Sequence, residues 1–180
     1  MSEKLRVINI CAGPGAGKST TAAGVFYKLK SNDINCELVT EFAKDNVWDK
    51  HFSVLDDQIF LIANQFHKMF RLIGQVEVAV TDAPFVLSWF YNNKELSKGR
   101  MGSAISLLLE AIYDYFDNTN YFLVREKIFN PKGRVHTEEE SKEIDVALLK
   151  ILTERKIPYE VVSGKGAADY IAKQYLSMRK

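Results

Sequence analysis

The chain has 180 residues, of which 47% are hydrophobic and 26% charged, and its formal net charge is +1. This length and composition indicate one globular domain with a full α/β core. A charge so near neutral argues against a surface devoted throughout to a nucleic-acid backbone, although a local basic patch remains open. No apolar run reaches bilayer length, residues 1–4 are too short and polar for a signal peptide, and Cys11 and Cys36 lack metal-ligand spacing. We therefore expect a cytoplasmic protein with reduced thiols and no membrane partner.

Residues 11–20 carry the most informative motif of the chain. The run before them, residues 5–11, is apolar and β-branched like a buried strand, and residues 20–30 place apolar side chains at helical spacing. A glycine-rich turn joins the two and leads into Lys18 and Ser19, which is the context of a phosphate-binding (Walker A) loop. Its backbone N–H groups form an anion nest, Lys18 reaches the β- and γ-phosphates, and the Ser19 hydroxyl binds Mg²⁺. The predicted nucleotide-binding residues are Gly13, Pro14, Gly15, Ala16, Gly17, Lys18, Ser19 and Thr20.

One position of this loop departs from the stricter motif. Ala12 stands where the first glycine is expected, and the looser motif, which allows alanine or glycine there, is met. The alternative interpretation is an ordinary glycine-rich turn between a strand and a helix. The flanking strand and helix favour the nucleotide site.

Two acids follow the next predicted strands. Residues 35–40 are predicted to form the second strand, which leads to Glu41, and residues 76–81 the third, which ends at Asp82. Carboxyl ends of parallel strands face the ligand crevice, so both carboxylates are expected beside the phosphate loop. Asp82 fits the Mg²⁺ side of such a site, although it is also a good helix cap before a proline. Glu41 fits a crevice position and a solvated loop about equally well.

Aromatic and basic residues follow Glu41. Trp48 and Phe52 alternate with cationic side chains and could form either a base-stacking wall or a lid that packs on its own core. Residues 54–73 predict a long amphipathic helix, in which Gln65 lies off the apolar stripe and faces either the crevice or solvent. Residues 103–116 predict another helix, which leads to a fourth strand at residues 121–124. The cationic residues of this possible rim are Lys44, Lys50, His51, Lys94, Lys98 and Arg100.

The segment after the fourth strand is a candidate lid. Residues 125–136 place four permanent cations around a turn that contains proline and glycine, and residues 137–140 form a capping box that begins the next helix. Arg125 and Arg134 are the better candidates for contact with a transferred phosphoryl group, because a planar guanidinium grips two phosphoryl oxygens. A solvated charged loop is the alternative. Residues 138–155, 159–162 and 167–178 complete the chain as helix, strand and helix.

With these residues in place, the chain resembles the P-loop nucleoside and nucleotide kinases over essentially its whole length. The resemblance implies a three-layer α/β fold in a single domain of residues 1–180, with a five-stranded parallel sheet in the order 2-3-1-4-5 and a short lid at about residues 125–137. It also implies ATP and Mg²⁺ as cofactors, with the metal held by Ser19 and Asp82. The catalytic residues that it implies are Lys18, Glu41, Asp82, Arg125 and Arg134.

The chain also resembles small P-loop proteins of large bacteriophages, among which are kinases that phosphorylate 5-hydroxymethyluridine in DNA. Asp82 is followed by Ala-Pro and not by an Asp-Arg-Tyr signature, which argues against copying the acceptor of thymidylate or deoxynucleoside kinases. We expect a phosphotransferase that moves the γ-phosphate of ATP to a hydroxyl or phosphate of a nucleoside- or nucleotide-type acceptor. The alternatives are a DNA-modification kinase, with modified DNA as partner, and an ATPase or nucleotide switch without an acceptor.

Overall fold

The structure is a computed structural model that describes residues 4–92, 99–126, 128–130, 132 and 135–178. Its centre is a sheet of five parallel strands in the order β2-β3-β1-β4-β5, as predicted. β1, the first strand of the sequence, lies in the middle of the sheet, where Ile8 is paired in register with Val80 of one neighbouring strand and Thr119 of the other. The strands are β1 (Arg6–Cys11), β2 (Cys36–Val39), β3 (Val78–Thr81), β4 (Asp117–Val124) and β5 (Glu160–Ser163).

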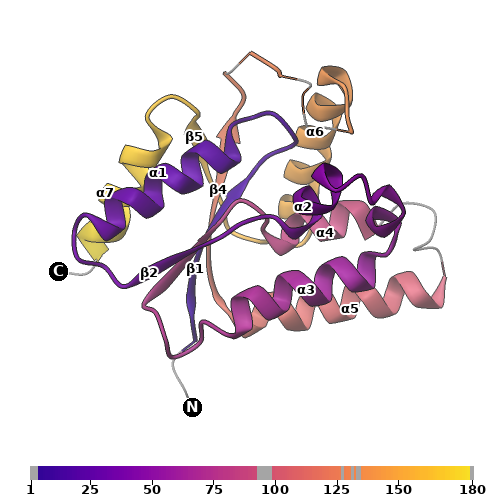
Figure 1. Cartoon of the computed structure of the whole chain (residues 1–180), viewed down its shortest axis with the longest axis horizontal. Helices are drawn as coiled ribbons and strands as arrows, with labels where there is room; N and C mark the ends of the chain where they lie inside the picture. Colours follow the sequence, from indigo (N-terminus) through magenta and orange to yellow (C-terminus); the bar gives the residue numbers. More distant parts are fainter. Residues whose placement is uncertain (1–3, 93–98, 127, 131, 133–134, 179–180) are drawn as a thin grey trace.

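Helices cover both faces of this sheet, which gives three layers (Figure 1). One face lies under α1 (Lys18–Lys30) and α7 (Ala167–Met178), which pack on Ile8, Ile10 and Val80. The other face lies under four helices, which pack on Val7, Cys11 and Ala79. Alternate residues of a strand point to opposite faces, so each central strand supplies both cores. The four helices of the second layer are α3 (Gln58–Phe70), α4 (Phe85–Asn92), α5 (Arg100–Tyr115) and α6 (Glu138–Glu154).

The structure differs from the sequence-based expectations where polar side chains decide the local fold. The helix expected at residues 54–73 is divided into a 3₁₀ turn, η1 (Phe52–Asp56), and α3, because the Asp57 side chain accepts a hydrogen bond from Phe60 N–H and caps a new helix. A short helix, α2 (Phe42–Trp48), follows β2 in a segment for which we predicted no helix. The fourth strand begins at Asp117 and not at residue 121, since Asn118 bonds to Asn9 of β1.

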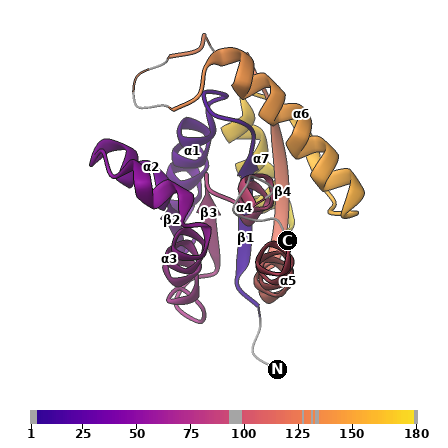
Figure 2. The ribbon, with the colours of Figure 1, turned by 90° about the vertical axis from the view of Figure 1, so that its right-hand side faces the viewer.

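The carboxyl ends of the strands lie at one edge of the sheet, and the segments that follow them gather there. These segments are the phosphate loop after β1, α2 after β2, and the chain between β4 and α6, which lies at the top of Figure 2 on the same side as the phosphate loop. A ligand crevice is expected at this edge of an open parallel sheet. Among the helices that the structure describes, none combines the length and the apolar character that a bilayer crossing requires.

Candidate active site

The phosphate loop adopts a conformation that suits an anion. Gly15 and Gly17 have φ angles of 83° and 103°, a left-handed region in which a side chain is strained. Gly17 is the N-cap of α1 and has no side chain with which to cap the first N–H groups of that helix. A phosphate group bound there would meet these donors and the positive end of the helix.

Lys18 lies across the inside of the same loop. Its Nζ donates a hydrogen bond to the Gly13 carbonyl oxygen at 3.2 Å. The Gly13 N–H group, in contrast, donates to Asp145 Oδ1 of α6 at 2.5 Å, so this amide does not face a ligand. The anion nest that the loop offers thus begins after Gly13.

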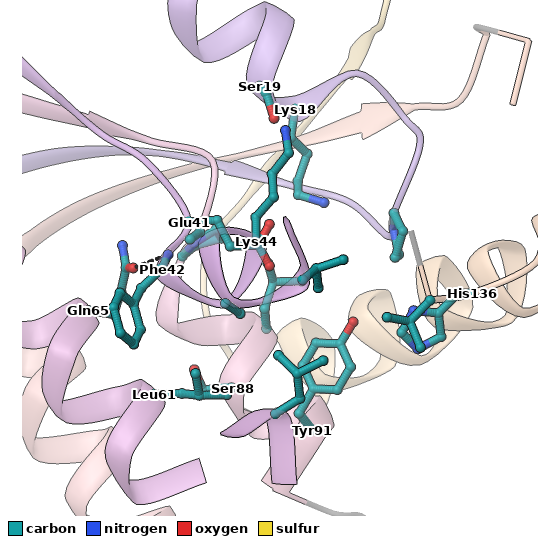
Figure 3. A pocket seen from close by; sticks show the side chains of 18 of the residues that line it. Lys18, Ser19, Glu41, Phe42, Lys44, Leu61, Gln65, Ser88, Tyr91 and His136 are labelled. Atoms are coloured by element: carbon teal, nitrogen blue, oxygen red, sulfur yellow. Dashed lines mark hydrogen bonds between the residues drawn. The ribbon is translucent and has the colours of Figure 1, made fainter. Parts of the chain in front are cut away.

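A cavity of about 1030 Å³ opens in front of the loop (Figure 3). Lys18 and Ser19 lie at one end of it, Gln65, Leu61 and Ser88 lie at the other, and Glu41 lies between them. The cavity volume is at the upper limit for sites that enclose one small molecule, so two adjacent ligands fit its size. Its lining comes from the phosphate loop, α2, η1, α3, α4 and residues 135–136.

The two predicted acids meet at the ends of neighbouring strands. Asp82 is only 3% exposed, and its Oδ1 accepts a hydrogen bond from the Glu41 N–H group at 3.2 Å. Thr81 strengthens the same junction, since its hydroxyl donates to the Val39 carbonyl oxygen and accepts from Ala83 N–H. Glu41 itself is the N-cap residue of α2 and lines the cavity. Asp82 therefore lies directly behind the residue that separates the two ends of the site.

Ser19 and Asp82 carry oxygen donors of the kind that Mg²⁺ accepts. Within the described ranges, no group of three or more His, Cys, Asp or Glu side chains is arranged to hold a metal ion. Mg²⁺ usually takes one or two protein oxygens and completes its shell with phosphate and water oxygens. Ser19 lines the cavity, whereas Asp82 is not among the residues that line it and lies behind Glu41.

Of the two arginines predicted for the lid, the structure describes only Arg125. Arg125 lies behind the phosphate loop, where its guanidinium binds Asp145 and the carbonyl oxygens of Pro14 and Ser141. Arg134 lies outside the described residues, as do Lys94 and Lys98 of the possible basic rim. The predicted capping box is confirmed: Thr137 accepts from Glu140 N–H, and the Glu140 side chain accepts from Thr137 N–H.

Gln65 places a buried amide at the end of the cavity that lies away from Lys18. It is 7% exposed, and its Oε1 accepts from the Phe42 N–H group at 3.2 Å. A backbone N–H group can only donate, so this bond fixes the orientation of the amide. The Gln65 Nε2 group then has no hydrogen-bond partner among the described residues. An unpaired buried donor beside a cavity is costly unless a ligand pairs with it.

Aromatic side chains also line the cavity. Tyr91 of α4 and His136 line the cavity with their ring centroids 6.1 Å apart. Burial, together with the nearby Glu41 carboxylate, raises the pKa of the Tyr91 phenol, so its hydroxyl stays protonated even at alkaline pH. Trp48 and Phe52 are 61% and 53% exposed, which is contrary to packing on a core of their own.

Sequence reasoning missed Asp145 and left Gln65, Tyr91 and His136 without a definite role. Asp145 occurs in a helix rich in charges, and its partner Gly13 lies 132 residues earlier, so no local pattern marks it. Gln65 was expected to lie off the apolar stripe, facing either the crevice or solvent, and the structure buries it on the same face of α3 as Ile62 and Met69.

No family model matches the chain, and no curated protein sequence matches it. Solved structures do share its fold. Deoxyadenosine kinase from M. mycoides with bound dATP superposes with a TM-score of 0.59 at 17% identity, over 94% of this chain and 98% of that one. The same enzyme with the products dCMP and a flexible dCDP gives 0.63 at 18%, over 95% and 99%. Thymidylate kinase from Ehrlichia chaffeensis gives 0.61 at 14%, over 99% and 100%. The chain therefore has the P-loop fold of nucleoside and nucleotide kinases. At these low sequence identities the similarity shows the fold and nothing more.

Proposed function

We propose that the chain transfers the γ-phosphate of ATP, with Mg²⁺, to a hydroxyl or phosphate of a nucleoside- or nucleotide-type acceptor. The observation that carries this proposal is the continuous cavity, which has a phosphate loop at one end and a polar, aromatic pocket at the other. The fold neighbours add support, because their own ligands are dATP, dCMP and dCDP. A nucleotide-binding protein without an acceptor would have no use for the second end.

The donor end would work by positioning and by neutralising charge, which is most of what phosphoryl transfer requires. The amides after Gly13 and the Lys18 ammonium would hold the β- and γ-phosphates, for which Lys18 exchanges its bond to the Gly13 oxygen for a phosphate oxygen. Ser19 and Asp82 would hold Mg²⁺, which when bound screens the negative charge of the transferred group. The first N–H groups of α1 would add their dipole at the same place.

Glu41 is the proposed contact with the acceptor. It lies between the two ends of the cavity, so its carboxylate can orient or deprotonate an acceptor hydroxyl that points at the γ-phosphate. The Tyr91 hydroxyl is a neutral donor at pH 7, and the raised pKa of this phenol extends its neutral form to alkaline pH. At the far end, a small rotation of the Gln65 side chain would let its Nε2 group, which has no partner among the described residues, donate to a ring nitrogen or carbonyl oxygen of the acceptor.

A DNA-modification kinase is the second candidate, and the exposed rings favour it. Phe52 lines the cavity, and Phe52 and Trp48 are both exposed, so the two rings could stack on the bases next to a flipped nucleotide. The charge of the same segment favours a small acceptor instead. Within residues 42–57 two permanent cations face four acids, namely Lys44 and Lys50 against Asp45, Asp49, Asp56 and Asp57.

The test is ATP consumption with Mg²⁺ against a panel of acceptors. The panel contains nucleosides, nucleoside monophosphates, nicotinamide riboside, and DNA with and without 5-hydroxymethyl bases. Stimulation by a small molecule is expected. Stimulation by modified DNA alone, weakening steeply with salt, would instead establish the DNA kinase. ATP turnover that no acceptor stimulates would leave an ATPase or nucleotide switch.

A further inference from the structure

Asp145 of α6 joins three segments directly behind the phosphate loop. Its Oδ1 accepts the Gly13 N–H group, and its Oδ2 accepts Arg125 Nε at 3.0 Å and Nη2 at 2.8 Å. The Arg125 guanidinium continues to the Pro14 carbonyl oxygen at 2.7 Å and the Ser141 carbonyl oxygen at 3.2 Å. The two side chains are only 11% and 16% exposed. A largely buried ion pair therefore connects the loop, the end of β4 and α6.

The phosphate loop packs closely against the residues behind it, with no space for a side chain at Gly13 or Gly15. A Cβ atom on Gly13 would lie 2.5 Å from the Ser141 carbonyl oxygen and 2.9 Å from Asp145 Oδ1. A Cβ atom on Gly15 would lie 2.7 Å from the Phe129 ring. The Ser141 backbone oxygen behind the loop therefore requires glycine at residue 13, whereas at residue 15 the requirement comes from the φ angle of 83°, with the Phe129 ring as a further close neighbour.

The hydrogen bonds of Arg125 bear on its role. Nε and Nη1 each donate once and Nη2 donates twice, so four of the five N–H groups of the guanidinium are engaged. If Arg125 turned toward a phosphoryl group, the Asp145 carboxylate would remain buried without its cation, which is strongly unfavourable. The geometry therefore opposes the expectation that Arg125 grips the transferred group.

We propose that Arg125 and Asp145 are positioning residues: their ion pair holds the first turn of the phosphate loop against α6, and neither side chain touches the transferred phosphoryl group. Fixing Gly13 and Pro14 from behind would aim the amides of residues 15–18 at the phosphates. The inference rests on the proposed function for its kinetic consequences, whereas the attachment of the loop is a property of the protein without nucleotide.

The first experiment is a double-mutant cycle on ATP affinity and turnover. Asp145→Ala and Arg125→Ala should each weaken Mg-ATP binding, measured by calorimetry, by about tenfold, because a loop displaced by even 1 Å aligns poorly with its ligand. The double variant should lose no more affinity for Mg-ATP than the single variant that binds it less tightly, since each change breaks the same ion pair. At saturating ATP, kcat should fall less than KM rises. Unchanged affinity in Asp145→Ala would overturn the proposal, as would a hundredfold loss of kcat on adding Arg125→Ala to that variant.

Two further variants serve as references. Asp145→Asn keeps an oxygen for the Gly13 N–H group and loses the charge that pairs with Arg125, so it should bind ATP better than the alanine variant does. It also provides a folded comparison if Asp145→Ala is unstable. Glu110→Gln removes a different arginine pair, between Glu110 and Arg155 at 2.6 Å, away from the loop, and should bind ATP like the wild type.

The second experiment does not depend on the proposed function. Amide hydrogen exchange, measured by NMR on the nucleotide-free protein, should show the Gly13 N–H group protected in the wild type and in Glu110→Gln. Its exchange should become at least tenfold faster in Asp145→Ala. If the wild type binds no nucleotide, the proposed function fails, and this readout still decides about the pair. Faster exchange supports the attachment, and unchanged exchange overturns it.

Discussion

Glu41 lies between the two ends of the cavity, the one at Lys18 and the one at Gln65, to which we have assigned the nucleotide and the acceptor in our proposal. Glu41→Gln keeps the size of the side chain and removes its charge. We expect kcat to fall by about a hundredfold or more, in the range for loss of a general base, while the affinity for ATP stays unchanged. Steady-state kinetics together with calorimetric ATP binding measure the two effects separately. An equal loss of both would reassign Glu41 to nucleotide binding.

Gln65 allows a similar test of the acceptor end. Gln65→Glu keeps the oxygen that accepts the Phe42 N–H group and replaces the unpaired donor with a second acceptor. We expect the KM for the acceptor to rise by about tenfold or more, the value of one hydrogen bond, with no change in the KM for ATP. Asn64→Asp, the same chemical change on the adjacent residue, which bonds to the Phe60 carbonyl oxygen near the surface, is the control. A rise in the KM for ATP in Gln65→Glu would contradict this role.

At the scale of single elements, the parts of the fold that depend on apolar periodicity were predictable. The phosphate loop was predictable for a different reason. Its glycines allow the tight turn, and Lys18 and Ser19 supply the charge and the hydroxyl that a phosphate site requires, so the motif is recognisable from the local sequence. The start of α3 was not, since a run of apolar residues hides the cap that Asp57 provides. The early residues of β4 were read as a turn because asparagine favours turns, whereas tertiary bonds to Asn9 and to the Pro158 carbonyl oxygen hold them in the sheet.

The candidate site shows the same division. Glu41 and Asp82 were predictable because a parallel sheet gathers the ends of its strands at one edge. Asp145 was not, because its role depends on how closely the phosphate loop approaches α6 in three dimensions. Arg125 was noticed for its charge, but its partner decides which way the guanidinium points.

The capping box at the start of α6 gives a prediction at the scale of one helix. Thr137→Ala removes the side chain that accepts the Glu140 N–H group and should destabilise the protein by about 1 kcal/mol. In a domain of this size that corresponds to a fall in Tm of roughly 2–4 °C. Thermal unfolding followed by circular dichroism measures it. Thr153→Ala, near the other end of the same helix, is the control, and an equal fall there would show that the cap has no special role.

For the whole molecule, buried thiol and phenol groups that are neutral at pH 7 should make the free energy of unfolding fall at alkaline pH. Burial raises the pKa of the Cys11 thiol from 9.0 to about 12 and raises those of the Tyr113 and Tyr121 phenols above 10.0. The unfolded chain therefore releases these protons at a lower pH than the folded protein does. The free energy of unfolding should be at its full value below about pH 8 and should decline as the pH rises through the unfolded pKa values toward the folded ones.

Urea unfolding at pH 7.5 and pH 10.5 measures this decline. Tyr113→Phe should make the decline smaller, because one of the shifted groups is removed. Tyr27→Phe, at a tyrosine that is 69% exposed, should leave it unchanged. A stability that is constant between the two pH values would contradict the assignment of these groups as buried and neutral.

The central claim for the molecule is that its two-ended cavity moves a phosphoryl group from nucleotide to acceptor. The most direct measurement follows label from γ-labelled ATP with Mg²⁺ into products, with each acceptor of the panel and with Lys18→Ala as the comparison. We expect label in the acceptor with the wild type, and a rate at least about a hundredfold lower in the correctly folded Lys18→Ala variant, because the ammonium that neutralises the transferred charge is gone. Label that appears only in inorganic phosphate, or equal transfer by the two proteins, would contradict the claim.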